Sequence, residues 1–220
     1  MKKHPVLEGI IIAVSTLIVL AVLGVIGFYF FILNFGTSKK PIIYLYPETA
    51  QTVHVELGSP ERLTHTYPKY EGGWDVIAQP NGDLTDLKTG RSLYALYWEG
   101  KGSSTRVKKD GFVVKGTDTI SFLEEKLALL GLNEREANEF IIYWLPELEG
   151  NDYNYIRFQT PEEINSGMEL KISPKPDTLI RIMMEYTALN KPIEVRPQEL
   201  KAPERKGFTA VEWGGTKIKP

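Results

Sequence analysis

Cysteine is absent from the 220-residue chain, and histidine occurs only three times. Without cysteine the chain can form no disulfide, no thiol nucleophile and no zinc site with thiolate ligands. Neither sign of charge is in excess, with 26 basic and 28 acidic residues. A nucleic-acid-binding protein would need a basic excess gathered on one face. We therefore predict no nucleic-acid partner, and we interpret the short basic run Arg106, Lys108 and Lys109 as a solvated loop.

Signature motifs of the common enzyme classes are also missing. The chain contains neither a G-x-S-x-G nucleophile elbow nor an H-E-x-x-H zinc motif, and residues 100–103 lack the upstream glycine of a Walker A loop. Beyond the N-terminal tail the histidines are His54, on the polar face of an alternating strand, and His65, which shares a face with Leu63 and Tyr67. We interpret both as surface or structural residues, and we predict no metal site and no cofactor.

One long apolar run stands out in the remaining sequence, because Gly9 to Leu33 contains no charged side chain. As a helix with about 1.5 Å of rise per residue it would measure roughly 37 Å, enough to cross a hydrocarbon layer of about 30 Å. A cleavable signal peptide has an apolar core of only about 7 to 15 residues. We therefore predict a short tail at 1–8 and an uncleaved transmembrane helix at 9–35, whose partner is the lipid bilayer. Gly9 and Ala13 form a small-xxx-small pair through which two spans could form a homodimer.

Basic residues flank the predicted span on both sides, with Lys2 and Lys3 before it and Lys39 and Lys40 after it. The α-amino group adds a charge to the first side, and the leading tail is very short. Both features favour an N-terminus in the cytoplasm. We therefore predict a single-pass protein of the cell membrane whose C-terminal domain is extracytoplasmic.

The chain after the span has the length of one globular domain, which we place at 41–215. A linker at 36–40 precedes it and a tail at 216–220 follows it. Apolar and polar residues alternate in its first half, as they do across 52–57, and this alternation is typical of half-buried strands. We predict strands at 41–47, 52–57, 63–67, 74–79, 93–98 and 112–114.

A helical pattern follows these strands. Apolar residues recur at helical spacing from Ile120 to Leu130 and stop at Gly131, whose position is typical of a left-handed helix cap. Asn133 and Glu136 then have the spacing of a capping box, which indicates the start of a second helix. We therefore predict a helical pair between two β segments.

The apolar segment 140–145 fits a helix face as well as a strand. Its β-branched and aromatic residues and the following Pro146 favour a strand, which would form a hairpin with 155–158. We predict further strands at 169–172, 179–186, 193–196 and 208–213. The fold class is therefore α+β, with a single N-terminal transmembrane helix and a mostly antiparallel, sandwich-like β domain that carries the inserted helical pair.

Short segments rich in proline, glycine and aromatic residues recur through the domain. They are KPIIYLYPE at 40–48, YPKY at 67–70, GW at 73–74, WEG at 98–100, FVVKG at 112–116, YWLP at 143–146 and VEWGG at 211–215. With these segments the domain resembles, over nearly its whole length, a family of uncharacterised bacterial proteins that are secreted or membrane-anchored. The resemblance implies an extracytoplasmic location and supplies no catalytic residues.

Two carboxylates stand beside tryptophans at predicted strand ends, Glu99 after Trp98 and Glu212 before Trp213. A carboxylate beside a large aromatic ring is typical of sugar recognition, and two carboxylates at the right separation can hydrolyse a glycoside. If the protein is an enzyme, Glu99 and Glu212 are its candidate catalytic residues. Trp98, Trp213 and Tyr97 are the candidate ligand-binding residues.

A structural interpretation competes with sugar chemistry. Arg181 lies between Ile180 and Ile182 in an apolar strand, and a buried arginine needs a carboxylate partner. Glu99 or Glu212 is the expected partner. We favour this structural ion pair, because no third catalytic feature accompanies the two carboxylates.

Three functions follow from these observations. The favoured one is a membrane-anchored, extracytoplasmic binding or scaffolding module of the cell envelope, with an envelope glycan or a membrane protein as its partner. The second is a glycan-acting hydrolase that uses paired carboxylates. The third is an accessory subunit of a larger membrane complex, which would present a large exposed apolar patch.

Overall fold

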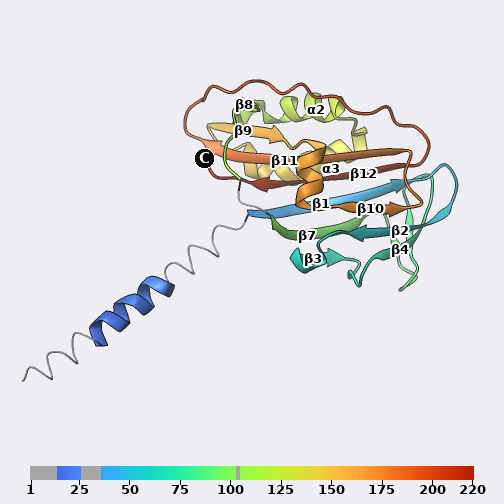
Figure 1. Cartoon of the computed structure of the whole chain (residues 1–220). Coiled ribbons are helices and arrows are strands. Elements are labelled where there is room, and N and C mark those ends of the chain that lie inside the picture. The colour runs from blue at the N-terminus through green and yellow to red at the C-terminus, as the bar shows by residue number, and fades with distance from the viewer. Residues whose placement is uncertain (1–13, 26–35, 103–104) are drawn as a thin grey trace, which may run out of the picture. The chain divides into compact units, whose positions relative to one another are not determined.

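The computed structural model describes residues 14–25, 36–102 and 105–220, and Figure 1 shows the arrangement of their helices and strands. The chain divides into two compact units, Met1–Phe35 and Gly36–Pro220. All the strands that the structure describes, and the two hydrophobic cores, belong to the second unit. The second unit is therefore the folded domain that carries the candidate sites.

The first unit contains one described helix, at residues 14–25. No helix among the described residues is long and apolar enough to span a membrane. The predicted span at 9–35 extends beyond this helix on both sides, and its flanking parts lie outside the described residues. The Gly9–Ala13 pair proposed for dimerisation lies there too.

A seven-stranded sheet forms the centre of the domain, in the order β3-β7-β1-β12-β11-β9-β8. Its strands are β1 (Gly36–Tyr46), β3 (Leu63–Tyr67), β7 (Leu96–Gly102), β8 (Phe112–Lys115), β9 (Tyr153–Phe158), β11 (Thr178–Leu189) and β12 (Thr209–Lys217). All neighbouring pairs are antiparallel except β11 and β12, which run parallel. The prediction of a mostly antiparallel α+β fold is therefore confirmed.

A second, five-stranded sheet has the order β10-β2-β4-β5-β6. Its strands are β2 (Gln51–Leu57), β4 (Trp74–Ala78), β5 (Leu84–Asp86), β6 (Ser92–Leu93) and β10 (Leu170–Ser173). The alternation predicted for 52–57 is confirmed, since Val53, Val55 and Leu57 are buried in the core between the sheets. The run 93–98, expected as one strand, is divided between β6 and β7.

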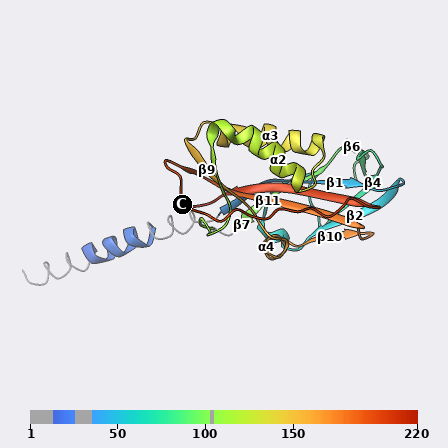
Figure 2. The ribbon, with the colours of Figure 1, turned by 90° about the horizontal axis from the view of Figure 1, so that it is seen from above.

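The central sheet is covered on both faces, which gives the domain three layers. Figure 2 shows α2 and α3 on one side of it and β10 with α4 on the other. The helices are α2 (Thr119–Leu129), α3 (Glu134–Leu148) and α4 (Pro161–Gly167), with single 3₁₀ turns at Pro60–Arg62 and Gly116–Asp118. Two separate hydrophobic cores fill the two interfaces.

Helix α3 corrects the prediction of a strand at 140–145 and of its hairpin with 155–158. Phe140, Trp144 and Leu148 are buried at intervals of four residues, so the bulky side chains form one helical stripe against the sheet. This packing outweighs their preference for strands. Pro146 lies in the last turn, where its missing N–H removes only one helical hydrogen bond.

The local signals around the helical pair are confirmed. Helix α2 ends before Gly131, which has a φ of 86°. The capping box at the start of α3 is formed in both directions, because the Asn133 side chain accepts from the Glu136 N–H and the Glu136 carboxylate accepts from the Asn133 N–H, each at 2.9 Å.

Residues 190–208, which we call the strap, connect the parallel strands β11 and β12 by running along the β8 side of the sheet to the C-terminal end of α2 (Figure 1). The Ala202 N–H donates to the Leu129 carbonyl at 3.0 Å, and Arg205 donates through Nη2 to the Gly131 carbonyl at 2.9 Å. The strand expected at 193–196 is absent, and only an isolated bridge at Arg196 forms there.

The domain boundaries differ from the predicted ones at both ends. Residues 36–40, expected as a linker, belong to β1, and Gly36 lies opposite Gly102 of β7. The expected tail at 216–220 extends β12 to Lys217. Beyond it, the Lys219 N–H donates to the Thr105 carbonyl at 3.0 Å.

Candidate functional site

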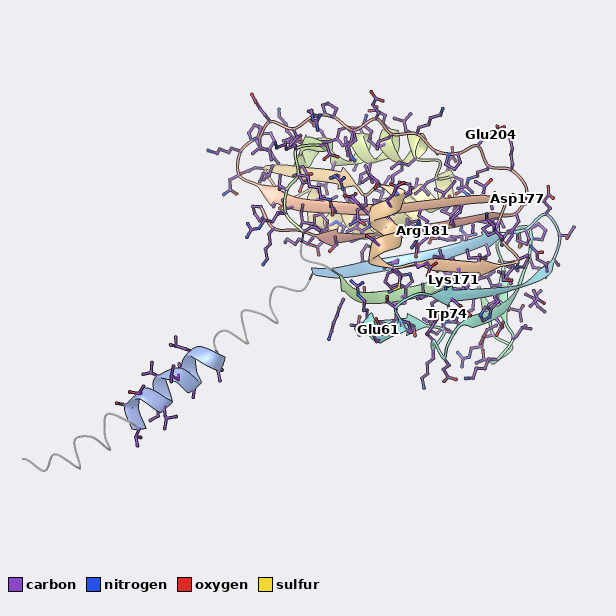
Figure 3. All side chains as sticks on the ribbon, viewed as in Figure 1. Glu61, Trp74, Lys171, Asp177, Arg181 and Glu204 are labelled. Atoms are coloured by element: carbon purple, nitrogen blue, oxygen red, sulfur yellow. The ribbon has the colours of Figure 1, made fainter. Side chains whose placement is uncertain are left out.

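The structure pairs Arg181 with Glu212. Parallel register places the two residues opposite each other on β11 and β12, and Arg181 Nε donates to Glu212 Oε2 at 2.6 Å. The second carboxylate oxygen, Oε1, accepts from Trp98 Nε1 at 2.9 Å. Figure 3 labels Arg181 beside α4, where its guanidinium also donates to Asn165 Oδ1 at 2.7 Å and to the Met168 carbonyl at 2.9 Å. Both oxygens of the buried Glu212 are therefore occupied by donors.

Glu99 lies on the opposite face of the seven-stranded sheet. Tyr97 and Trp213 both lie opposite Ile42 of β1, so they share one face, and Glu99 follows Tyr97 by two residues on that face. Glu212 points the other way, beside Trp98. Glu99 is therefore not the partner of Arg181, and Glu99 and Glu212 cannot flank one glycosidic bond.

The aromatic residues predicted to bind a ligand do not form a platform. Trp98 and Trp213 are 2% and 0% exposed and belong to different cores. Trp213 packs edge-on against Phe140 at a centroid distance of 5.3 Å. Tyr97 is half-buried, and this burial and a hydrogen bond to Glu99 raise the pKa of its hydroxyl. Trp98 and Trp213 are therefore core residues, and of the three predicted ligand-binding residues only Tyr97 is partly exposed.

The two histidines lie at the surface. His54 Nδ1 is 2.7 Å from Asp75 Oδ1 and its Nε2 is 3.1 Å from Glu56 Oε1. The hydrogen bond to Asp75 raises the pKa of His54 more than its slight burial lowers it. His65 is exposed beside Glu99, with an Nδ1–Oε2 distance of 3.6 Å. No group of three or more metal-binding side chains occurs within the described part of the chain.

A charged network lies beside α4, and none of its residues was predicted from the sequence as a site residue. Arg157 donates to Asp110 at 3.0 Å, to Glu163 at 2.8 Å and to the fully buried Glu185 at 3.1 Å. Partial burial would raise the pKa of Glu163, but hydrogen bonds from Arg157 and Lys108 lower it to about 2. These charges satisfy one another beside a cleft of about 280 Å³, so we interpret the network as structural.

A groove of about 1170 Å³ runs along β8, and we call it the β8 groove. Strand β8 is the last strand of the seven-stranded sheet, and among the described strands it pairs only with β9. An edge strand presents the N–H and carbonyl groups of every second residue outward. The β8 groove therefore combines a large open volume with unpaired strand backbone.

Helix α2 forms one wall of the β8 groove and the strap forms the other. Phe112 of β8 packs edge-on against Phe122 of α2 at 5.2 Å, and Lys126 Nζ lies 5.3 Å from the Phe112 ring centroid. The strap is held at Arg196, whose carbonyl accepts from the Gly111 N–H and whose N–H donates to the Lys109 carbonyl, each at 2.9 Å.

Apolar side chains line the walls of the β8 groove, and charges of both signs stand among them. The apolar residues are Phe112, Val113, Val114, Phe122, Ile193 and Val195, and the charged ones are Lys109, Lys115, Asp118, Glu125, Lys126, Glu194 and Arg196. None was predicted as a site residue. The sequence signal was the short alternating run between Pro192 and Pro197, which reads as a strand although it forms a groove wall.

Comparisons of this chain with known protein families, curated proteins and solved structures each gave no match. The resemblance carried by the short proline-, glycine- and aromatic-rich segments therefore stays a prediction.

Proposed function

We propose that this protein is a membrane-anchored module of the cell envelope that binds an extended peptide segment of another envelope protein in the β8 groove. The single observation that carries the proposal is the unpaired edge of β8 at the floor of a large groove. A peptide that adds to a sheet edge gains main-chain hydrogen bonds, and flanking pockets select alternate side chains.

The dimensions of the β8 groove suit a peptide. At about 3.3 Å per residue, the four residues of β8 offer roughly 13 Å of pairing edge. The groove volume of about 1170 Å³ exceeds the range of about 300–1,000 Å³ typical of small-molecule pockets. Phe112, Val113 and Val114 alternate above and below this edge, so the groove offers apolar contacts on both sides of a bound strand.

The membrane anchor of this proposal is supported by the uncharged run Gly9 to Leu33, and the charge balance around it favours an extracytoplasmic domain. A hydrolase is not supported, because Glu99 and Glu212 lie on opposite faces of the sheet. An accessory subunit with a broad apolar interface is less well supported. The exposed large apolar residues of the domain are scattered, and only Ile120 and Leu129 share an element, α2: Tyr67, Leu87, Tyr94, Ile120, Leu129, Ile142 and Leu179.

Main-chain pairing can be tested with peptides selected from phage-displayed random heptapeptides on the intact chain in detergent. Each residue of a selected peptide is then N-methylated in turn, and the Kd is measured by calorimetry. Methylation at alternate residues should weaken binding about tenfold or more, because those N–H groups face β8, and methylation between them should have little effect. Uniform effects, or no selected peptide, would refute the proposal.

A matched pair of variants locates the binding site. Ile193→Asp places a charge on the strap wall of the β8 groove and should abolish peptide binding. Ile142→Asp makes the same change at a residue of α3 that is 68% exposed and lies outside the groove. It should leave the Kd unchanged. Equal effects of the two variants would place the peptide elsewhere.

A further inference from the structure

Three segments, whose described parts meet at one end of the seven-stranded sheet, contain basic residues and no acidic ones. Residues 36–41, 100–109 and 216–220 contain eight lysines and arginines and no acidic residue. In the whole chain the two signs of charge nearly balance. The concentration at this end is therefore a property of the fold, since the three segments are far apart in sequence.

Strand pairing holds the three segments together. Thr37 lies opposite Lys101 in the β1–β7 pair, and Lys39 lies opposite Gly215 in the β1–β12 pair. Arg106 bridges Lys219, and the Val107 N–H donates to the Lys219 carbonyl at 3.1 Å. The basic run 106–109, interpreted from sequence as a solvated loop, is thus tied to the C-terminal residues.

Most of these cations have no acidic partner among the residues that the structure describes. Lys108 pairs with Glu163, and Lys40 Nζ lies 4.7 Å from the Tyr143 ring centroid. The other six form no ion pair with any described residue, and we call them the basic end: Lys39, Lys101, Arg106, Lys109, Lys217 and Lys219. The opposite end of the sheet carries both signs of charge, since Figure 3 labels the acidic Asp177 and Glu204 there and Lys206 pairs with Glu204 at 2.8 Å.

The basic end is also the end at which the chain leaves the apolar run. That run stops at Leu33, and β1 begins at Gly36, so only two residues separate them in sequence. At about 3.5 Å per extended residue, the start of β1 lies within roughly 10 Å of the end of the run. Anionic headgroups of a membrane surface at the end of the run would therefore lie within about one Debye length of the start of β1. This length is near 10 Å at 0.1 M salt.

We infer that the basic end is a docking surface for the anionic lipid headgroups of the membrane that holds the span, and that it fixes the orientation of the domain on the bilayer. This inference rests on the anchor of the proposed function. Each lysine or arginine near an anionic surface strengthens docking about fivefold. The basic end therefore orients the domain only where anionic lipid is present, and only at moderate salt.

The absence of cysteine allows a clean test with single spin labels on the intact chain in lipid nanodiscs. One label is attached through Pro220→Cys, beside the basic end. A comparison label is attached through Thr49→Cys, an exposed site beyond the other end of β1. Accessibility to a water-soluble relaxation agent is measured with phosphatidylcholine alone and with phosphatidylglycerol added.

Added phosphatidylglycerol should protect the label at 220 and leave the label at 49 accessible. The protection should disappear in 1 M salt, where the Debye length falls to about 3 Å. Charge reversal at Lys101, Arg106, Lys217 and Lys219 to glutamate should weaken docking by several hundred-fold, at about fivefold or more for each residue. Reversal at four exposed lysines outside the basic end, Lys69, Lys175, Lys201 and Lys206, changes the net charge equally and should leave the protection intact.

Equal accessibility of the label at 220 in both lipid mixtures would overturn the inference, and so would equal effects of the two charge-reversal variants. Failure of the chain to stay in the disc, or its extraction from membranes by alkali, would overturn the anchor instead. In that case flotation of the chain with phosphatidylglycerol vesicles tests the basic end alone: salt-sensitive flotation that the reversal variant loses would support it, and absence of flotation would refute it.

Discussion

Replacing Glu212 with leucine should strongly destabilise the domain. Glu212 is 0% exposed, and the Arg181 side chain that it contacts is 6% exposed. The variant leaves this guanidinium buried without a counter-charge, which typically costs about 3–5 kcal/mol. For a domain of this size each kcal/mol lowers Tm by about 2–4 °C, so we expect a fall of roughly 6–20 °C. Thermal unfolding followed by circular dichroism measures it.

Two further variants separate loss of the charge from loss of volume. In Glu212→Gln only one acceptor oxygen remains, so either Arg181 or Trp98 faces an amide N–H. The loss of stability should therefore lie between zero and the loss in Glu212→Leu. Combining Arg181→Met with Glu212→Leu removes both charges, and the double variant should recover most of the lost stability, because a well-packed apolar pair is often as stable as a buried ion pair. Destabilisation below about 1 kcal/mol in Glu212→Leu, or strictly additive effects in the double variant, would refute the argument.

Two other predictions concern the charged network and the helical core. The pKa of Glu163 is lowered from 4.5 to about 2, so its contribution to stability should be complete above pH 4.5 and disappear as the pH falls toward 2. The free energy of unfolding, measured across this pH range, should therefore fall by an amount that Glu163→Gln does not show. The same pH profile in that variant as in the unchanged protein would contradict the prediction. Phe140→Ala should cost about 3–5 kcal/mol, because Phe140 is fully buried against Trp213; a loss below about 1 kcal/mol in urea unfolding would show that α3 is not packed as described.

Several elements of the fold could be predicted because their causes are local. The capping box of Asn133 and Glu136, the helix end at Gly131 and the alternation across 52–57 each depend on residues a few positions apart. The segment 140–145 could not be assigned in this way. Its residues fit either a strand or one buried stripe of a helix, and only the sheet beneath it decides between them.

The candidate sites also combine a feature with a local cause and features that depend on tertiary packing. The sequence indicated that Arg181 needs a carboxylate, because a charge in an apolar strand must be paired. It could not choose between Glu99 and Glu212, because the choice depends on which face of the sheet each side chain occupies. The β8 groove could not be predicted either, because the alternating run between Pro192 and Pro197 indicated a strand. The groove forms where the strap, held at Arg196, separates from an edge strand.

The sequence by itself determined the uncharged run at 9–33, the β-rich character of the domain and the need of Arg181 for a partner, because each follows from local composition or periodicity. Only the tertiary structure decided that Arg181 meets Glu212, that β8 is an edge strand and that three basic segments meet at one end. These features depend on strand pairing between residues distant in sequence, such as Arg106 and Lys219, which no local pattern specifies.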